Sequence, residues 1–496
     1  MDESDRKTRL LREIGLTGLV ATGVCSMMGA SINVVPIMIQ RSVPGIGSSV
    51  VEAYLFSIIP ASLAALSYAI LSSAMPRAGG SYVYASRALS PYLGFVASFS
   101  QWFGLSIAIG VISYLIVPFF RDICLVLGWL ELASTLDAGP VRLFLSLLIL
   151  WSFVALNLKG VRIYEKTLVP LMLIMFALGS VVIVSGFLFD HQDFISAVFQ
   201  ESGYVIPDPE ISRLGISDYL AASAILFTSF IGFDSIAQAG GEARNPARNL
   251  PLAIGMAVAI VGIFDMLFTA AIYHAVPWSY IAEKAQSQDL TAPGLLGYLL
   301  PDGLTVAIIL GAAVALLNDL PAMLLSVSRL MFSWAEDGII PSGIAKIDKG
   351  SGVPRVATML SGCMASIGIV GSYLASDFFL GIDILVTSML VNFIFMCLAV
   401  LVLPKRNREI ANEVTVLNSW AARKAVALFG IVLLTLFLAV HVWKDLNNDL
   451  IAWYFHSTFV WLLVMGIATL IYFYEVSRLK NKGISINEVV SNLPSE

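Results

Sequence analysis

The chain has 496 residues, of which 58% are hydrophobic and only 13% are charged, and its mean hydropathy is +0.85. So few charged residues cannot cover the surface of a water-soluble protein of this length, which excludes a soluble globular protein. The formal net charge of −5 says little about partners. We therefore expect an integral membrane protein that is surrounded by the lipid bilayer and binds no nucleic acid.

Twelve stretches are long and apolar enough to be membrane-spanning helices, which need about 20 residues to cross a hydrocarbon core of roughly 30 Å. They leave no room for a second, soluble domain. The first stretch follows a charged segment and carries no small-residue cleavage pattern, so we expect it to be retained as a span. The stretches begin near residues 14, 48, 92, 141, 166, 218, 249, 303, 355, 379, 424 and 452.

The first and the sixth of these stretches are interrupted by glycine and polar residues. The sequence CSMMGASIN (Cys25 to Asn33) lies inside the first, and FIGFD (Phe230 to Asp234) lies inside the sixth. One glycine in one span is typical of helix packing, whereas matching interruptions in two halves of a membrane protein indicate a transporter's binding site. Non-helical backbone inside a membrane is tolerated only where a cavity, ion or substrate meets its N–H and C=O groups.

Lys and Arg are distributed unevenly between alternate loops. If the N-terminus is cytoplasmic, the inside segments hold 22 of the 29 basic residues and the outside loops hold 5. Because cytoplasmic loops carry the excess of basic residues, both termini are predicted to be cytoplasmic. We expect the membrane to be the plasma (inner) membrane. The longest outside loops, 189–217 and 276–302, contain short apolar runs that favour surface helices capping an outer vestibule.

The sequence shows no pattern that is typical of an enzyme, a metal site or a cofactor site. No Ser/His/Asp grouping, HExxH or phosphate loop is present, and the four histidines are scattered. We expect no enzymatic activity, no cofactor and no metal. The cysteines have no metal or redox spacing and are interpreted as packing residues: Cys25, Cys124, Cys363 and Cys397.

Three cytoplasmic motifs carry a resemblance to a known family. PRAGGSYVYASRALSPYLGF (Pro76 to Phe95) follows the second span, GGEARNPARNLPLAI (Gly240 to Ile254) follows the sixth, and SRLMFSWAEDGIIP (Ser328 to Pro341) follows the eighth. Each motif resembles one that the amino acid-polyamine-organocation (APC) superfamily of transporters carries at the same position. The resemblance, to the amino acid permeases of that superfamily, spans all twelve helices.

The resemblance implies an all-α integral membrane fold of twelve transmembrane helices, with five-plus-five inverted repeats and discontinuous helices 1 and 6. Helices 1 to 5 (residues 14–188) and helices 6 to 10 (residues 218–404) would form two halves related by a pseudo-two-fold axis in the membrane plane. The other parts would be a cytoplasmic N-terminal segment (1–13), an extracellular loop (189–217), a cytoplasmic loop with peripheral helices 11 and 12 (405–475) and a cytoplasmic tail (476–496).

The resemblance also implies a substrate site at the two breaks. In helix 1, backbone amides at the start of the outer half-helix would face an amino acid carboxylate, with the helix dipole behind them. In helix 6, carbonyls near Phe230 and Ile231 would take the ammonium group, and Phe230 or Phe233 would close over the ligand. The candidate substrate-binding residues are Ser26, Met28, Gly29, Ala30, Ser31, Asn33, Phe230, Ile231, Gly232, Phe233 and Asp234.

Ser31 and Asn33 depart from the family pattern, which has a glycine and a bulky apolar residue near these positions. Ser31 adds a hydroxyl donor, and Asn33 either points towards the pocket or, like Ser31, satisfies backbone groups of the broken helix. A substrate more polar than a simple apolar amino acid, or an amine that lacks the carboxylate, therefore stays open.

The residues that bind the coupling ion in relatives have no counterpart in this chain. Sodium-coupled relatives bind the ion with hydroxyl groups of helix 8, but the stretch from Gly311 to Ala315 offers no hydroxyl. Other relatives place a lysine amine from helix 5 in the same volume. That position falls near Met175 in this chain, and Lys166 lies too close to the cytoplasmic end. The remaining titratable groups are carboxylates inside the membrane. A charged side chain is energetically costly at that depth, so each of them is a candidate functional residue. They are Asp234, Asp265, Asp319 and Asp383.

Asp234 and Asp319 are the candidates for a coupling or structural role. For Asp234 we expect hydrogen bonds that hold the broken helix. Pro321, close to Asp319, removes a backbone donor and kinks helix 8. Charged residues of the cytoplasmic motifs are candidates for ion pairs that close the inner face, unless they only set topology: Arg77, Arg87, Glu242, Arg244, Arg329, Glu336 and Asp337.

The sequence therefore predicts a secondary transporter that moves amino acids or related amines by alternating access around a site between helices 1, 3, 6, 8 and 10. It would work without sodium, by proton symport or by exchange. The alternative is a non-transporting membrane sensor or receptor that uses the same pocket. A membrane enzyme lacks a catalytic grouping, and a channel would not need two helix breaks at one pocket. Oligomeric state is left open.

Overall fold

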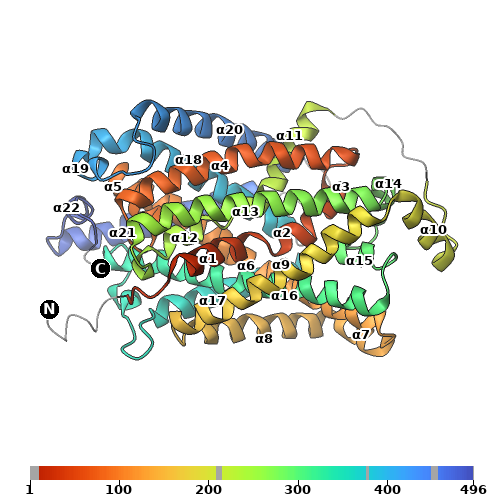
Figure 1. Ribbon diagram of the computed structural model, residues 1–496. Coiled ribbons are helices and arrows are strands. Elements are labelled where there is room, and N and C mark those ends of the chain that lie inside the picture. The colour runs from red at the N-terminus through yellow and green to blue at the C-terminus, as the bar shows by residue number, and fades with distance from the viewer. Residues whose placement is uncertain (1–9, 208–214, 376–378, 448–455, 495–496) are drawn as a thin grey trace.

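In the computed structural model of the protein, residues 10–207, 215–375, 379–447 and 456–494 are described. Within these ranges the chain forms helices joined by loops, and its β-pairing is limited to two isolated bridges. The long helices run side by side along a common direction (Figure 1). An all-helical bundle is the arrangement in which every backbone polar group of a membrane span is satisfied within its own segment.

Eleven helical segments among the described residues are long and apolar enough to cross a membrane. They correspond in order to the second to twelfth predicted stretches. They are α4 (Val50–Ala74), α6 (Pro91–Val126), α8 (Gly139–Asn157), α9 (Val161–Leu188), α11 (Ile216–Leu226) continued by η3 (Phe227–Phe230) and α12 (Asp234–Gln238), α13 (Pro246–Ala275), α16 (Asp302–Glu336), α17 (Arg355–Ala375), α18 (Phe379–Arg406), α20 (Trp420–Leu446) and α21 (Ser457–Asn481).

The first predicted stretch folds into three short helices, α1 (Leu16–Met27), α2 (Ala30–Asn33) and α3 (Val35–Ser42). Each of them alone is shorter than the roughly 20 residues that a span needs. The interruption predicted from the CSMMGASIN sequence is therefore present as a break between α1 and α2.

Short helices gather at both ends of the bundle. The helices α5 (Gly80–Ala88), α19 (Arg408–Asn412) and α22 (Ile486–Val489) lie at the end where the described chain begins and ends, and α7 (Leu130–Asp137), α10 (His191–Ser202), α14 (Trp278–Ala285) and α15 (Ala292–Leu296) lie at the opposite end (Figure 1). The surface helices predicted within loops 189–217 and 276–302 are thus present as α10, α14 and α15. Residues 208–214 of the first loop lie outside the described residues.

Local sequence explains where several helices begin. Asp190 accepts hydrogen bonds from the amides of Gln192 and Asp193, and the Asp193 carboxylate accepts one from the Asp190 amide at 3.0 Å, which forms a capping box before α10. At the start of α6, the Ser90 hydroxyl accepts a hydrogen bond from the Leu93 amide at 3.2 Å, and Pro91 occupies the first helical position.

The helices differ in how deeply they are buried. In the most apolar 18-residue window, 94% of the residues are buried in α6 and in the α11–α12 segment, against 28% in α20 and 22% in α21. α6 and the broken α11–α12 segment therefore form the centre of the bundle, and α20 and α21 present apolar faces outward, as helices in contact with lipid do.

Candidate functional site

The break in the first stretch lies at Met28 and Gly29, between α1 and α2. Met28 closes α1, because its amide still donates to the Val24 carbonyl at 3.0 Å. A Cβ atom added at Gly29 would overlap the carboxylate of Asp319 from α16. Glycine is therefore needed here because a carboxylate lies directly against the backbone. The side chains of Ala30 and Ser31 lie outside what the structure describes.

The break in the sixth stretch lies at Ile231, Gly232 and Phe233, between η3 and α12. Gly232 has a φ of 142°, which favours glycine strongly. A Cβ atom at Gly232 would overlap the carbonyl oxygen of Ser26 at the end of α1. The two interruptions, 203 residues apart in the chain, are thus packed against each other.

Polar side chains hold the two breaks in place. The Ser26 and Ser235 hydroxyls, from α1 and α12, lie 3.0 Å apart in a hydrogen bond. One oxygen of Asp234 accepts a hydrogen bond from the Gly232 amide at 3.1 Å, and the other accepts one from Gln101 of α6. Asp234 thus makes the contacts expected of a residue that holds the broken helix.

A buried cavity of about 50 Å³ lies beside the breaks. One water molecule takes up about 30 Å³ of liquid, so this cavity must widen before an amino acid or an amine can enter. Its walls come from the first, third, sixth, eighth and tenth stretches, which are the five helices expected from the sequence. All the lining residues are buried: Ser26, Met27, Val35, Ala108, Val111, Ile112, Leu115, Thr228, Ile231, Asp319, Met323, Gly381, Ile382 and Leu385. We call it the front cavity.

A second cavity of about 20 Å³ lies on the other side of the helix 1 break and is called the back cavity. Asn33 lines this cavity and not the front one, and its amide donates to the Gly29 carbonyl at 3.3 Å. Of the two roles considered for Asn33, this geometry favours satisfaction of the broken backbone. The other lining residues are Met28, Ile32, Met175, Leu178, Gly179, Val182, Phe264, Phe268, Ile308, Gly311, Ala312 and Ala315.

The two aromatic residues expected to close over a ligand are packed elsewhere in this conformation. The Phe230 ring lies 5.5 Å from the ring of Tyr54, and the Phe233 ring stacks on that of Phe393 at 5.0 Å, measured between centroids. Neither residue is among the described residues that line the front cavity. Their role as lids stays a prediction that requires a rearrangement of helix 6.

Sequence reasoning did not find the buried hydrogen-bond network that continues from Gln101. Gln238 donates to Gln101 at 3.3 Å and to Ser81 at 2.8 Å, the Ser81 and Tyr68 hydroxyls are 2.6 Å apart, and Asn392 donates to Tyr68 at 2.7 Å. The network joins α12, α6, α5, α4 and α18. The signal in the sequence was an amide side chain inside an apolar span, as at Gln101 and Asn392, because such a group must find a partner.

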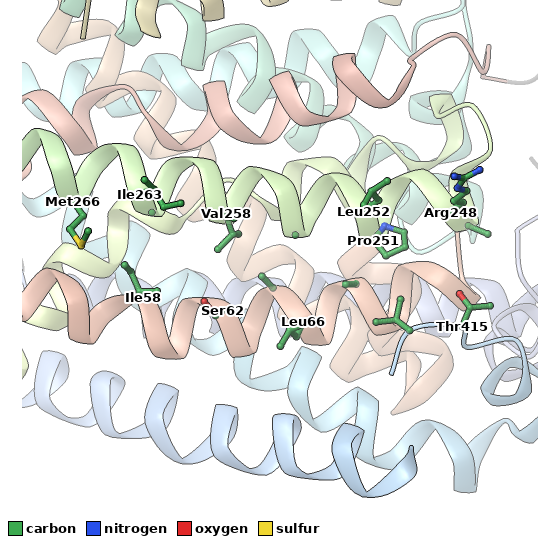
Figure 2. Close-up of a pocket in the computed structure, with 17 residues that line it drawn as sticks. Ile58, Ser62, Leu66, Arg248, Pro251, Leu252, Val258, Ile263, Met266 and Thr415 are labelled. Carbon is green, nitrogen blue, oxygen red and sulfur yellow. The ribbon is translucent and has the colours of Figure 1, made fainter. Parts of the chain in front are cut away.

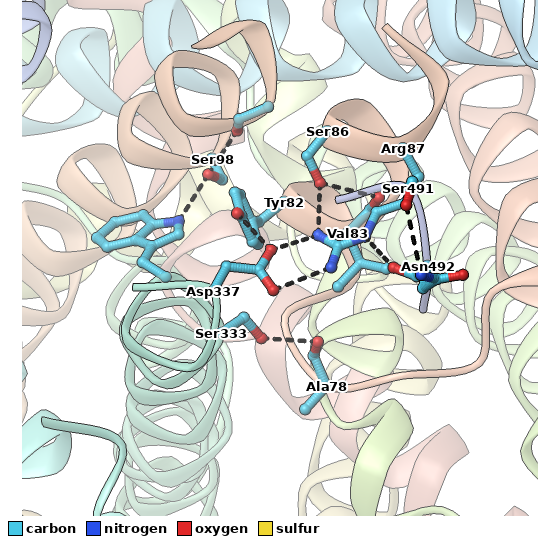
Figure 3. Close-up of polar contacts among 12 residues, drawn as sticks. Ala78, Tyr82, Val83, Ser86, Arg87, Ser98, Ser333, Asp337, Ser491 and Asn492 are labelled. Carbon is cyan, nitrogen blue, oxygen red and sulfur yellow. Dashed lines mark hydrogen bonds and ion pairs between the residues drawn. The ribbon is translucent and has the colours of Figure 1, made fainter. Parts of the chain in front are cut away.

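Two buried ion pairs lie at the end of the bundle where the described chain begins and ends. The guanidinium of Arg329 binds the carboxylate of Glu242, with side-chain exposures of 3% and 0%. The guanidinium of Arg87 binds Asp337 through two nitrogens, and Tyr82 donates to the same carboxylate (Figure 3). Four of the seven charged candidates therefore form two ion pairs.

The Arg87 pair is also covered by the C-terminal segment. Burial alone would lower the pKa of the Arg87 guanidinium, but the hydrogen bonds and charge of Asp337 outweigh it and raise that pKa, so the pair stays charged. Arg87 donates to the Asn492 carbonyl at 3.2 Å (Figure 3), and Arg77 donates to the Pro494 carbonyl at 3.0 Å. Arg77, Arg244 and Glu336, the other candidates, belong to neither pair.

At the opposite end, Arg41 of α3 holds the loop that follows α14. It pairs with Asp289 at 3.1 Å and donates to the Gln288 carbonyl at 3.0 Å. Tyr273 of α13 donates to the Pro36 carbonyl at 2.8 Å. The outer half of the first stretch is thus attached to the loops that were expected to cap a vestibule.

A groove of about 1040 Å³ lies between α4 and α13 and is not the site at the breaks. In Figure 2 Ile58 and Leu66 line the groove from α4, Val258 and Ile263 line it from α13, and Arg248 and Thr415 lie at one end. Ile263 is 60% exposed. An exposed apolar groove on a membrane-spanning bundle faces lipid tails.

Discontinuous helices that meet at a buried cavity, inside a bundle of apolar helices, define a multi-pass membrane protein of the permease class. Residues 14–478 match the amino acid permease family, and the chain therefore belongs to this family of the APC superfamily. The resemblance inferred from the three motifs is confirmed. A permease family also agrees with the expectation that the protein is not an enzyme.

Curated relatives share about a quarter of their aligned residues with this chain. The chain is 27% identical over 367 residues to "Cationic amino acid transporter 2, vacuolar" of Arabidopsis thaliana. The aligned region covers 72% of this chain and 55% of the relative. The chain is 24% identical over 409 residues to "Branched-chain amino acid permease BcaP" of Bacillus subtilis (strain 168), which covers 81% and 83% respectively. The chain thus spans little more than half the length of the Arabidopsis relative.

Proposed function

We propose that the protein is a secondary transporter that moves amino acids or related amines across a membrane by alternating access. The observation that carries the proposal is that the breaks at Gly29 and Gly232 meet beside a buried cavity in a member of the amino acid permease family. Broken helices inside a membrane offer backbone groups to a ligand at the midplane. On this view α1, α2 and α3 together form the first of twelve spans, and residues 14–188 and 218–404 are the inverted repeats.

Alternating access would work by releasing one set of closing contacts at a time. Inner opening would break the pairs of Arg329 with Glu242 and of Arg87 with Asp337. Outer opening would release the loop that Arg41 holds. Shifting a two-state equilibrium from 1:99 to 99:1 takes about 5.5 kcal/mol of differential binding, so substrate contacts in the widened front cavity would have to favour the opposite state by an amount of this order.

The proposed coupling is sodium-independent, by proton symport or exchange, because the back cavity is lined by Met175, Gly311, Ala312 and Ala315 where relatives place an ion site or an amine. The proposed location is the plasma membrane, with both termini in the cytoplasm. In support, the described chain begins and ends on the same side of the bundle, and α10, α14 and α15 lie on the other side.

Uptake into liposomes tests the proposal. Purified protein is reconstituted, and labelled leucine, arginine and their decarboxylated amines are added with and without unlabelled ligand inside, and with and without an inward proton gradient. Accumulation that needs internal ligand indicates exchange, and accumulation that needs the gradient indicates proton symport. Protein-free liposomes are the control. Saturable binding without any uptake would overturn the proposal in favour of a sensor.

A further inference from the structure

Asp319 is the charged side chain of the front cavity. Of the described residues that line the cavity, it alone carries a charge, and it is 2% exposed. Its carboxylate lies against Gly29, because a Cβ atom there would overlap it. The negative charge is therefore placed directly at the helix 1 break, where the resemblance predicts that backbone amides face the carboxylate of an amino acid.

The neighbouring residue fixes this orientation. The amide of Asn318 donates to the Cys25 sulfur at 2.8 Å and reaches the Leu168 carbonyl at 3.5 Å. These contacts attach α16 to α1 and α9, and Asn318 is not among the described residues that line the front cavity. The next side chain along the helix, that of Asp319, is directed to the cavity and the break.

The rest of the cavity wall offers a ligand almost no polar groups. The Ser26 hydroxyl is bonded to that of Ser235, and the Thr228 hydroxyl donates to the Ile225 carbonyl at 2.7 Å. The remaining side chains are apolar or absent, as at Gly381. They are Met27, Val35, Ala108, Val111, Ile112, Leu115, Ile231, Met323, Ile382 and Leu385.

A single buried carboxylate in an apolar pocket selects its ligand by charge. A substrate carboxylate at Gly29 would lie beside the Asp319 carboxylate, and like charges repel strongly where water is excluded. An ammonium group at the same place would form a charge-assisted hydrogen bond with the Asp319 carboxylate. The apolar wall would then cover a hydrocarbon body.

We propose that the front cavity binds amines that lack a carboxylate, with Asp319 as the group that binds their ammonium and with an apolar body against α6 and α18. This inference rests on the proposed transport function and narrows its substrate class from amino acids and amines to amines. Asp319 is thus a specificity-determining residue of the site.

Matched ligand pairs test the inference on the wild-type protein. Leucine is compared with 3-methylbutylamine, and arginine with agmatine, since each pair differs only by the α-carboxylate. Leucinamide keeps the bulk of leucine without its negative charge. Binding is measured as ligand-induced thermal stabilisation of purified protein in nanodiscs, and transport as exchange in liposomes. We expect 3-methylbutylamine and leucinamide to bind at least tenfold more tightly than leucine, and agmatine more tightly than arginine.

Two variants test whether the preference for amines depends on Asp319. Asp319→Asn keeps the shape and removes the charge, and it should lose the preference for the amine over leucine. Asp265→Asn is the matched control, because Asp265 is also a buried intramembrane carboxylate but accepts a hydrogen bond from Tyr54 at 2.8 Å and does not line the front cavity. It should keep the wild-type preference. If Asp319→Asn does not fold, the wild-type comparison still decides.

Two outcomes overturn the inference and differ in what they leave standing. If leucine or arginine binds and exchanges better than its decarboxylated partner, the amine assignment is overturned while the transport function stands. In that case, stronger leucine binding at lower pH would make Asp319 a proton-binding group. No binding and no exchange of any of these ligands at millimolar concentration would overturn both the inference and the proposed function.

Discussion

The front and back cavities lie on opposite sides of the helix 1 break and differ in chemistry. The front cavity carries the Asp319 carboxylate and backbone that has left helical geometry at Ile231. The back cavity is lined by apolar residues together with Asn33, whose amide is already bonded to Gly29. The charge that a ligand would meet is thus confined to one side of the break.

This difference shows how one broken helix can separate two tasks. A carboxylate in an apolar pocket discriminates between ligands by charge, whereas a pocket without charge or free hydroxyls cannot hold a cation that has lost its water. In related folds the back position carries the coupling ion or an amine. Here the uncharged lining of the back cavity supports a structural role for it, and the Asp319 carboxylate supports a role of the front cavity in ligand selectivity.

The largest effect is expected from filling the breaks. Gly29→Leu would drive a side chain into the Asp319 carboxylate, and Gly232→Leu would place one on the Ser26 carbonyl at a φ of 142°. Both variants should lose ligand binding and transport, by at least a hundredfold, because the front cavity can no longer form. Binding and liposome uptake are measured on protein that elutes as wild type by size exclusion.

Gly255→Leu is the control for these variants, since nothing lies within 4 Å of a Cβ atom at Gly255. It should retain binding and uptake. Wild-type affinity and transport in Gly29→Leu and Gly232→Leu would mean that the breaks are not the ligand site, and the comparison between front and back cavities would lose its meaning.

A smaller effect is expected from weakening the inner closure. Glu242→Gln leaves Arg329 buried without its anion, which typically costs about 3–5 kcal/mol. Water entry on opening relieves that cost, so the inward-open state should gain population and apparent affinity for an externally added ligand should fall about tenfold or more. In a background without native cysteines, Thr228→Cys of the front cavity should then react faster with a cytoplasmic thiol reagent.

Ala312→Cys of the back cavity should not show this increase, because only the front cavity is expected to open to the cytoplasm. Asp348→Asn serves as the matched charge control, since Asp348 pairs with the 58% exposed Arg355 and such surface pairs are worth about 0–1 kcal/mol. Unchanged labelling of Thr228→Cys in the Glu242→Gln background would make Glu242 a packing or topological residue and remove it from the gate.

A third change tests whether Asn33 belongs to the back cavity alone. Asn33→Ala removes a hydrogen bond to the Gly29 carbonyl and should destabilise the protein by about 1 kcal/mol, with ligand affinity changed less than threefold. Asn157→Ala is the control, because Asn157 makes the same type of contact, to the Phe153 carbonyl at 3.1 Å, in α8. A tenfold change in ligand preference in Asn33→Ala alone would show that Asn33 contacts the substrate.

Much of this architecture could be predicted from the sequence, because the bilayer imposes a simple requirement on the length and polarity of each span. A span must be apolar for about 20 residues, so eleven of the twelve stretches appear as long helical segments, and the glycine-containing interruptions mark the two breaks. Asp234 was expected to hold the broken helix, and its bond to the Gly232 amide fits a local rule, since the two residues are neighbours in the chain.

What could not be predicted depends on contacts between distant segments. Nothing in the chain near Asp319 shows that its carboxylate lies against Gly29, some 290 residues earlier. The direction of Asn33 was equally open, because a residue next to a break can turn to either side. The packing of Phe233 on Phe393 likewise depends on which rotamer the closed conformation selects, which spacing alone does not determine.

The smallest effect is expected from removing sodium. The back cavity is lined by Gly311, Ala312 and Ala315 and by no described hydroxyl group, so it lacks the hydroxyl ligands that sodium-coupled relatives use. Replacing sodium by potassium or choline at constant ionic strength and pH should leave initial uptake rates in liposomes unchanged within experimental error. A known sodium-coupled transporter in parallel liposomes shows that the exchange of cations is complete. A steep, saturable dependence on sodium would place a cation site in this protein after all, and the division between a ligand-reading front cavity and an uncharged back cavity would have to be abandoned.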